Sequence, residues 1–185
     1  QAWVFGVPFV MMRDVTALDR SDGRHRVTLS DGTQVSARAV VLATGVSYRR
    51  LDVASLDALV GAGVFYGASI AEAQGMKGKH AVVVGGGNSA GQAALYLARY
   101  ARQVTILVRS SSLAASMSSY LIDEIDAAHN VDVRYSTEVV DGGGDAHLEW
   151  LTLADRTSGD RERVPVAGLF ILIGAHPHTD WLPGQ

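Results

Sequence analysis

The sequence has 185 residues, of which 48% are hydrophobic and 19% are charged, and its formal net charge is −3. These values are typical of folded globular domains and argue against a disordered or fibrous chain. Because acidic and basic residues are interspersed, we expect no broad basic surface, and therefore no nucleic-acid partner and no attraction to anionic membranes.

Apolar runs and cysteine content narrow the functional classes further. No apolar run approaches the roughly 18 residues that a membrane-spanning helix needs, so no membrane association is expected. The first residues lack the charged start and long apolar middle of a signal peptide, which favours a cytoplasmic location. The sequence contains no cysteine, which removes disulfides, thiolate metal sites and dithiol redox chemistry from what this chain can do by itself.

The first third of the chain predicts antiparallel strands. Residues 9–19 are followed by a turn, and residues 24–30 and 35–39 alternate apolar and polar side chains around further turn-forming residues, which is typical of a three-stranded meander. Residues 39–43 are apolar on both faces and end in Thr44 and Gly45, so we expect a strand of a parallel sheet that is covered on both sides. The change in composition near residues 46–52 indicates a domain boundary.

The middle third has the pattern of an α/β domain. A buried strand is predicted over 80–84, a helix over 88–101 and a second buried strand over 103–108. A second helix over 113–128 and a strand over 131–135 follow. The last third returns to antiparallel strands at 148–153 and 163–166, and residues 168–174 form another strand buried on both faces. The predicted fold class is α/β, a Rossmann-like parallel sheet with helices and an antiparallel meander.

A Gly-x-Gly-x-x-Ala pattern at Gly85, Gly87 and Ala90 lies directly between the predicted strand over 80–84 and the predicted helix. The first glycine permits a tight turn, the second lets the backbone approach a pyrophosphate, and the alanine keeps the helix close to the sheet. The free amides at the helix start would then face the phosphates. The alternative is a strand-to-helix turn with no ligand, but the strand before and the helix after favour a dinucleotide site.

The residue at the end of the next strand bears on which nicotinamide cofactor binds. An acidic residue at this position serves the ribose hydroxyls of NAD, whereas an arginine suits the 2′-phosphate of NADP. Here the position holds Arg109, followed by Ser110 and two further serines. The sequence therefore favours NADPH, the alternative being that Arg109 is a solvated residue at a strand end.

The stretch from Gly61 to Thr179 resembles the NADPH domain of the low-molecular-weight thioredoxin reductases and their flavoprotein relatives. The resemblance depends on four pieces in the same order, namely residues 61–64, 82–90, 107–109 and 168–177. Residues 1–50 resemble the second half of that family's FAD domain, whose Ala-Thr-Gly end approaches the flavin nucleotide. The resemblance thus implies a partial FAD-domain segment at 1–50, an NAD(P)H-binding domain at 51–175, and a return to the FAD domain at 176–185.

The sequence departs from the family pattern in three respects. It lacks the opening FAD fingerprint and the closing segment of such proteins, so we expect a piece of a larger protein that does not bind FAD stably alone. The redox Cys-x-x-Cys would fall at Gly67 to Ile70, where no thiol exists, so thioredoxin reduction by the usual route is excluded for these residues. Of the family's arginine set for the 2′-phosphate, Arg109 is present, whereas Ser110 and Ala114 stand at the other two positions.

The resemblance implies an NADPH-dependent FAD oxidoreductase in which this chain delivers hydride from NADPH to FAD and has no dithiol of its own. The electrons would pass to an unknown acceptor, a redox protein or a small molecule, and a homodimer is possible in such a family. No side chain is expected to act as an acid, base or nucleophile. The expected cofactor-binding residues are Gly85, Gly86, Gly87, Asn88, Ser89, Ala90, Arg109, Ser110, Ile173 and Gly174 for NADPH, and Thr44 and Gly45 for FAD.

Several alternatives stay open at this point. The chain could be a non-catalytic or regulatory NAD(P)H-binding module, or its parent could prefer NADH. His176 and His178 lack a third ligand for a metal, and no nucleophile-elbow sequence supports a triad of Ser89, His80 and Asp123. The acidic residues at 123, 124 and 126 are expected on the solvated face of a helix.

Overall fold

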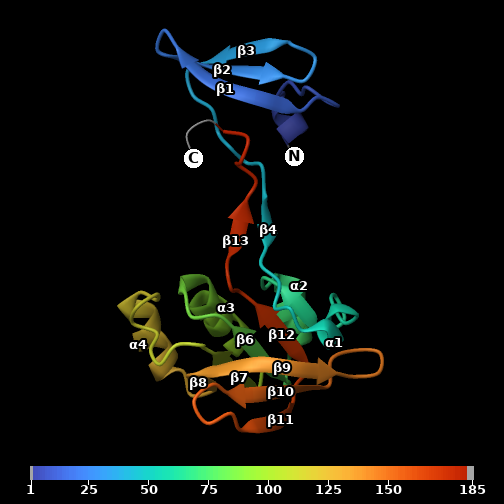
Figure 1. Ribbon diagram of the computed structural model, residues 1–185, viewed down its shortest axis with the longest axis vertical. Helices are drawn as coiled ribbons and strands as arrows, with labels where there is room; N and C mark the ends of the chain where they lie inside the picture. The colour runs from blue at the N-terminus through green and yellow to red at the C-terminus, as the bar shows by residue number, and fades with distance from the viewer. Residues whose placement is uncertain (1, 183–185) are drawn as a thin grey trace. The chain divides into compact units, whose positions relative to one another are not determined.

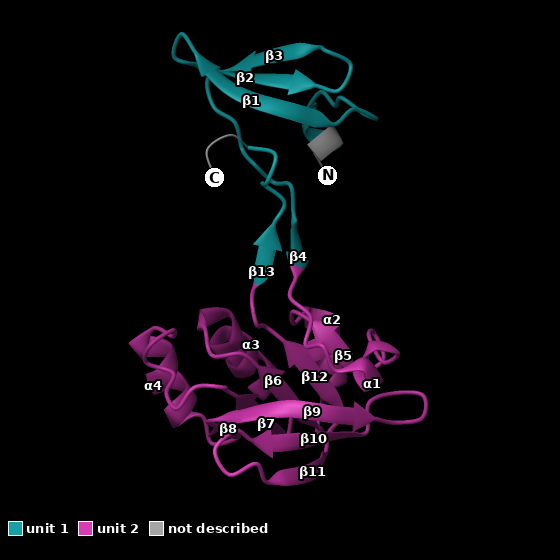
Figure 2. Cartoon of the chain, in the orientation of Figure 1, with its two compact units in different colours: residues 1–47, 175–185 teal, residues 48–174 magenta. Residues whose placement is uncertain are grey.

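The computed structural model describes residues 2–182 and divides into two compact units, which Figure 2 colours separately. Unit 1 comprises residues 1–47 with 175–185, and unit 2 comprises residues 48–174. Unit 2 contains all four α-helices of the described residues, and it also contains the glycine-rich segment between residues 85 and 87.

Unit 1 contains the predicted meander. A short 3₁₀ helix, η1 (Ala2–Phe5), precedes strands β1 (Val15–Ser21), β2 (Arg24–Leu29) and β3 (Gln34–Ala37), which pair antiparallel in the order β1-β2-β3. Turns with positive φ at Asp22, Gly23 and Gly32 join the strands, as the turn residues in the sequence predict. Strands β4 (Val46–Tyr48) and β13 (Ala175–Pro177) form a two-stranded sheet that was not predicted.

The buried strand predicted over residues 39–43 is wrong for this structure. These residues form no strand, and Val41 and Leu42 keep 89% and 44% of their surface exposed. A central strand needs a hydrogen-bonded neighbour on each side and a layer over each face. No strand described within residues 2–182 pairs with this segment, so its apolar pattern has no sheet to join.

Unit 2 is built on a five-stranded parallel sheet in the order β5-β12-β6-β7-β8 (Figure 1; β5 is labelled in Figure 2). The strands and the helices that connect them are, in chain order, α1 (Ala54–Asp57), β5 (Val64–Tyr66), α2 (Ile70–Gly75), β6 (His80–Val84), α3 (Asn88–Ala98), β7 (Gln103–Leu107), α4 (Ser119–Ala127), β8 (Val131–Arg134) and β12 (Gly168–Ile171). The mixed α/β fold predicted from the sequence is thus confirmed.

A second, antiparallel sheet covers one face of the parallel sheet. It consists of β9 (Thr137–Gly143), β10 (Trp150–Asp155) and β11 (Arg161–Pro165), with β10 in the centre. Val82 and Val84 of β6 pack toward this sheet, whereas Ala81 and Val83 pack in the cluster that contains α3 and α4. Because both faces of the parallel sheet are buried, successive side chains of its strands are all apolar, which gives continuous apolar runs in the sequence.

The ends of two helices differ from the sequence expectation. Helix α3 ends at Ala98 rather than near residue 101, and α4 begins at Ser119 rather than near residue 113. Leu113 and Met117, which fall within the helix that we predicted over 113–128, lie in the turn before α4 and are still buried in the helix-side core. The burial of these two side chains explains why the sequence before Ser119 resembled the start of a helix although no helix forms there.

Candidate functional site

The turn between β6 and α3 requires glycine at its first position. Gly85 has φ +145°, and an added Cβ would overlap the carbonyl oxygen of Leu172 and lie 3.0 Å from its carbonyl carbon. The same Cβ would lie 3.2 Å from the Cβ of Ala90, which is fully buried on the sheet side of α3. Gly85 and Ala90 therefore let α3 and the segment after β12 pack closely around the end of β6.

The next two glycines have different surroundings. A Cβ on Gly86 would lie 3.0 Å from Cγ1 of Val108, whereas a Cβ on Gly87 would meet nothing nearer than the Ser116 carbonyl oxygen at 3.7 Å. Gly87 is the N-cap of α3, with φ −97°, and it offers no side-chain hydrogen bond to the helix start. In contrast, Ser69 and Glu72 cap α2 with a reciprocal pair of hydrogen bonds. The Ala90 N–H donates to the Gly87 carbonyl oxygen at 3.0 Å, so the N–H groups of Asn88 and Ser89 are left to be satisfied by water or by a ligand.

The segment just before α4 packs beside this turn. The Ser116 hydroxyl donates to the Gly86 carbonyl oxygen at 2.8 Å. The Asn88 side-chain amide donates to Oγ of Ser118 at 3.0 Å, and its oxygen accepts from the Ser118 backbone N–H at 2.8 Å. The Asn88 side chain is therefore engaged with the start of α4, which leaves its backbone for any ligand, while Ser89 is exposed.

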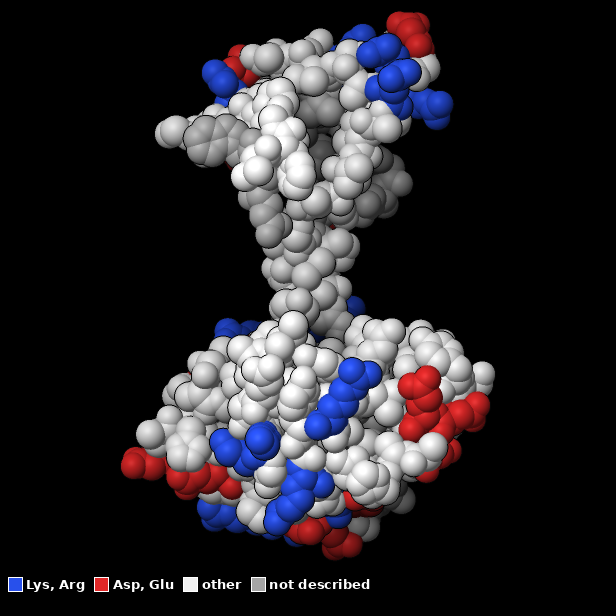
Figure 3. Space-filling view, turned by 180° about the vertical axis from the view of Figure 1, so that it is seen from behind, with Lys and Arg blue, Asp and Glu red and all other residues white. Residues whose placement is uncertain are grey.

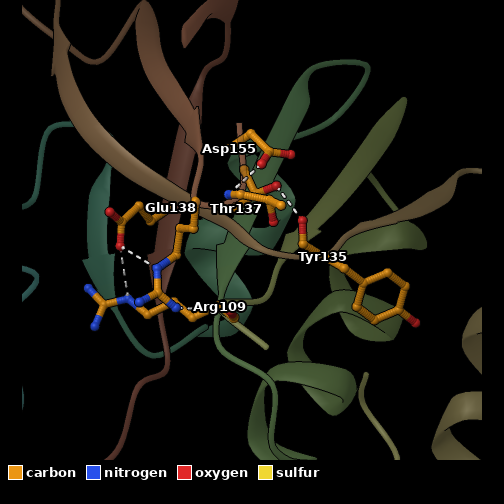
Figure 4. Close-up of polar contacts among 7 residues, drawn as sticks. Arg109, Tyr135, Thr137, Glu138 and Asp155 are labelled. Atoms are coloured by element: carbon orange, nitrogen blue, oxygen red, sulfur yellow. Dashed lines mark hydrogen bonds and ion pairs between the residues drawn. The ribbon is translucent and has the colours of Figure 1, made fainter. Parts of the chain in front are cut away.

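Arg109 lies beyond the carboxyl end of β7, and the structure adds two partners that the sequence did not reveal. Its Nε lies 3.5 Å from Oε2 of Glu138, and Nε of Arg156 lies 3.5 Å from the same oxygen. Figure 4 shows the Glu138 carboxylate facing the Arg109 guanidinium. Ser110 is exposed, and its hydroxyl donates to the Ser112 carbonyl oxygen at 2.7 Å. Glu138 and Arg156 are distant in sequence from Arg109, so no local motif could have identified them.

The parallel register brings most of the predicted site residues to one edge of the sheet. Val84 is paired with Leu107 and with Ile171, so the segments that follow β6, β7 and β12 leave the sheet at the same level. These segments contain the glycine turn, Arg109 and the pair Ile173 and Gly174. Gly174 has φ +101°, and its carbonyl oxygen accepts from the Arg49 N–H at 3.1 Å. Ligands of open α/β sheets bind at this edge.

The two residues predicted to approach FAD belong to unit 1. The Thr44 carbonyl oxygen lies 3.1 Å from Nδ1 of His178, and the Gly45 carbonyl oxygen accepts from the His178 N–H at 3.0 Å. Nε2 of His178 lies 2.7 Å from Oγ of Ser47. His178 thus makes three hydrogen bonds to the segment from Thr44 to Ser47. Within residues 2–182, no group of three or more metal-ligating side chains is found.

The residues of the discounted triad are not brought together. His80 begins β6, whereas Ser89 follows the opposite end of that strand, and five residues at about 3.3 Å each separate the two ends. His80 instead lies 3.1 Å from the Pro165 carbonyl oxygen and 2.9 Å from Oγ1 of Thr105. Burial lowers the pKa of His80 below its usual value. Asp123 lies on the exposed side of α4.

The stretch from Gly67 to Ile70, where the family's dithiol would fall, joins β5 to α2. Gly67 has φ +103°, Ser69 caps α2 and Ile70 is exposed. No helix in the described part of the chain is long and apolar enough to span a membrane. Lys and Arg side chains lie among Asp and Glu side chains on the face of unit 2 that Figure 3 shows.

A parallel sheet with a glycine turn and a helix start at its carboxyl edge is the architecture of dinucleotide-binding α/β proteins. A family model of pyridine nucleotide-disulphide oxidoreductases matches residues 4–185, and the chain belongs to that family. Thioredoxin reductase from Streptomyces clavuligerus is 36% identical over 185 residues, which cover 100% of this chain and 56% of that protein. An alkyl hydroperoxide reductase component from Escherichia coli is 33% identical over 163 residues, covering 88% of this chain and 31% of that protein.

Solved structures agree with this assignment. The crystal structure of T. acidophilum thioredoxin reductase matches with a TM-score of 0.74 and 26% identity, covering 92% of this chain and 55% of that one. Thioredoxin reductase from Giardia duodenalis matches with a TM-score of 0.78, and at 23% identity this match supports the fold alone. The chain is thioredoxin reductase-like, and it spans 56% of the length of the S. clavuligerus relative.

Proposed function

We propose that unit 2 is the NADPH-binding portion of a thioredoxin reductase-like flavoprotein oxidoreductase and delivers hydride from NADPH to FAD. The proposal depends mainly on the structure of the turn from Gly85 to Gly87. This turn follows a buried parallel strand, it has no room for a Cβ at its first position, and it leaves the start of α3 without a side-chain cap. Membership of the pyridine nucleotide-disulphide oxidoreductase family supports the same reading.

Different residues at the carboxyl edge of the parallel sheet would bind different parts of the dinucleotide. Backbone amides at the start of α3 would bind the pyrophosphate, because these donors and the helix dipole both favour an anion. Arg109 would bind the 2′-phosphate, and Ile173 and Gly174, which follow the neighbouring strand β12, would border the nicotinamide half. Thr44 and Gly45 of unit 1 would contribute to an FAD site.

When bound, NADPH supplies a hydride, and FAD accepts it together with one proton. The protein's own part is to position the two groups and to exclude side reactions. Residues 1–185 contain no cysteine, so we propose that the electrons leave from the flavin to an external redox protein or small molecule rather than through a dithiol of this chain. A cytoplasmic location and a homodimer belong to the same proposal.

Gly87→Ala tests nucleotide binding at this turn. The added methyl meets only an ordinary contact with Ser116 and requires no unusual φ, so the fold should be kept. It would, however, stand where the pyrophosphate must approach the backbone, and affinity for NADPH should fall about tenfold or more. The measurement is titration of the 185-residue chain with NADPH, with circular dichroism as the control for folding. Unchanged affinity in a folded variant would remove the turn from the proposed site.

Hydride delivery is tested in a protein that joins this chain to a complete FAD-binding portion. Anaerobic addition of NADPH should bleach the flavin absorbance, and the Gly87→Ala variant should slow the bleaching. A flavin that binds but stays oxidised while NADPH binds normally would favour the non-catalytic nucleotide-binding module instead.

A further inference from the structure

Three charged side chains from three separate segments meet beyond the carboxyl end of β7. Arg109 follows β7, Glu138 is the second residue of β9, and Arg156 follows β10. Both arginine Nε atoms lie 3.5 Å from one carboxylate oxygen of Glu138, and Nη1 of Arg156 donates to the Arg109 carbonyl oxygen at 3.0 Å. The second arginine is therefore held against the backbone of the first.

Backbone hydrogen bonds fix the segments that carry these side chains. The Thr137 N–H donates to the Val108 carbonyl oxygen at 3.1 Å, and the Ser136 N–H donates to that of Ser110 at 3.0 Å. The Arg156 N–H donates to the Ser136 carbonyl oxygen at 2.7 Å. The start of β9 is thus bonded to the end of β7, and Arg156 is bonded to the start of β9.

The turn after Arg156 is also fixed. Oδ1 of Asp155 accepts from the backbone N–H groups of Thr157 and Ser158 at 2.7 and 2.9 Å. These two hydrogen bonds lower the pKa of Asp155, because they stabilise its charged carboxylate. Arg156 is therefore the first residue of a turn between β10 and β11 that hydrogen bonds from backbone N–H groups hold closed.

The charges of this cluster suit a phosphate better than a ribose. Two guanidinium groups and one carboxylate leave one net positive charge, and both arginines reach Glu138 through Nε. The side chains of Arg109 and Arg156 are 59% and 48% exposed, whereas Glu138 is 33% exposed. A ribose hydroxyl would use the carboxylate as acceptor, but the two arginines outnumber that carboxylate, and the cluster stays positive. A phosphate monoester has a charge between about −1.5 and −2 and several acceptor oxygens for the planar guanidinium forks.

We propose that Arg156, which lies on the β10–β11 hairpin, is a second side chain that binds the 2′-phosphate of NADPH, and that Glu138 holds the two arginines together. The proposal rests on the proposed NADPH site and adds a residue outside the family's arginine set. Ser110 and Ala114 stand at the two positions of that set where this chain has no arginine. Arg156 would supply from another segment the positive charge that those positions lack.

The test compares Arg156→Ala with Arg161→Ala in the 185-residue chain. Arg161 is the first residue of β11, on the far side of the same turn, and is exposed, so its replacement changes the net charge equally. Binding of NADPH and NADH is measured by titration, and adenosine 2′,5′-bisphosphate serves as a competitor. Arg156→Ala should weaken NADPH and the bisphosphate about tenfold and leave NADH unchanged, because NADH has no 2′-phosphate.

Two further variants sharpen the result. Arg156→Lys keeps the charge but loses the planar fork, so it should restore part of the NADPH affinity. Glu138→Gln keeps an acceptor oxygen for the arginines and removes the negative charge, so NADPH should bind more tightly while NADH does not. Weaker NADPH binding in Glu138→Gln would overturn the role given to Glu138.

The outcomes separate this inference from the proposed function. If the wild-type chain binds NADPH, and Arg156→Ala weakens it no more than Arg161→Ala does, the inference about Arg156 is wrong and the NADPH site stands. An equal loss of NADPH and NADH in Arg156→Ala would likewise overturn it, since the 2′-phosphate would not be what Arg156 reads. If the wild-type chain binds neither dinucleotide, the proposed function itself fails, and this inference fails with it.

Discussion

Replacing Gly85 with alanine should destabilise unit 2 through the contact between the glycine turn and the segment after β12. The added methyl would be directed at the backbone of Leu172, with the carbonyl carbon only 3.0 Å away. Backbone atoms of a neighbouring segment cannot rotate aside as a flexible side chain can. The Leu172 N–H also donates to the Val84 carbonyl oxygen at 2.8 Å, so a shift of Leu172 would disturb the pairing of β12 with β6.

Two terms set the size of the effect. Alanine at φ +145° adopts a backbone conformation that costs about 1–3 kcal/mol for a residue with a Cβ. Overpacking against fixed neighbours costs about 1–3 kcal/mol more. The free energy of unfolding should therefore fall by about 2–6 kcal/mol, against a typical total of about 5–15 kcal/mol for a domain.

Urea denaturation followed by far-ultraviolet circular dichroism measures this effect, because α1 to α4 all lie in unit 2 and dominate the helical signal. Two glycines serve as matched controls. Gly75 lies at the end of α2 with open space around the Cβ position, and Gly87 has only an ordinary contact. Alanine at either position should change stability by less than about 1 kcal/mol. A Gly85→Ala variant as stable as these controls would refute the close-approach argument.

Three other changes test the packing and electrostatics of unit 2. Phe170→Ala removes a fully buried ring of β12 and should cost about 3–5 kcal/mol in urea denaturation, and a loss below about 1 kcal/mol would contradict its central place in the core. Asn88→Ala removes two hydrogen bonds to Ser118 and should raise amide exchange at the start of α4, whereas Ser89→Ala should not. Burial lowers the pKa of His80, so the unfolded state takes up its proton first as the pH falls below about 6.5. The contribution of His80 to the free energy of unfolding should therefore be complete above that pH and be lost as the pH falls through the lower pKa of the folded state. A His80→Gln variant whose free energy of unfolding changes with pH in the same way would show that His80 is not the cause.

The features that the sequence predicted are those with a local physical cause. Strands buried on both faces produce continuous apolar runs, and the runs at 80–84 and 103–108 correspond to β6 and β7. The glycine turn was recognisable because a strand-to-helix corner next to another strand leaves no room for a side chain at Gly85. In these cases the neighbours that impose the pattern lie within one strand-helix-strand unit.

The failures have non-local causes. Residues 39–43 have the composition of a central strand, but a strand exists only where other strands pair with it, and none described here does. Strand β9 was missed because its sequence mixes acidic residues and glycines among the valines. Gly142 of that strand is required by packing, since a Cβ there would lie 2.5 Å from Leu56 and 2.8 Å from Leu151. Such contacts between distant segments leave no periodic signal in the sequence.

The antiparallel sheet of unit 2 covers one face of the parallel sheet and also positions two residues of the proposed site. Its inner side chains, including Val139 and Leu153, bury the face of the parallel sheet that the helices leave open. The hydrogen bonds from Thr137 to Val108 and from Ser136 to Ser110 fix its edge at the end of β7. The side chains next to that edge, Glu138 and Arg156, are then necessarily beside Arg109. Because the same register sets both the core packing and the position of the two charges, a mutation that shifts β9 by one residue would cost stability and, if the proposed NADPH site is correct, cofactor selectivity together.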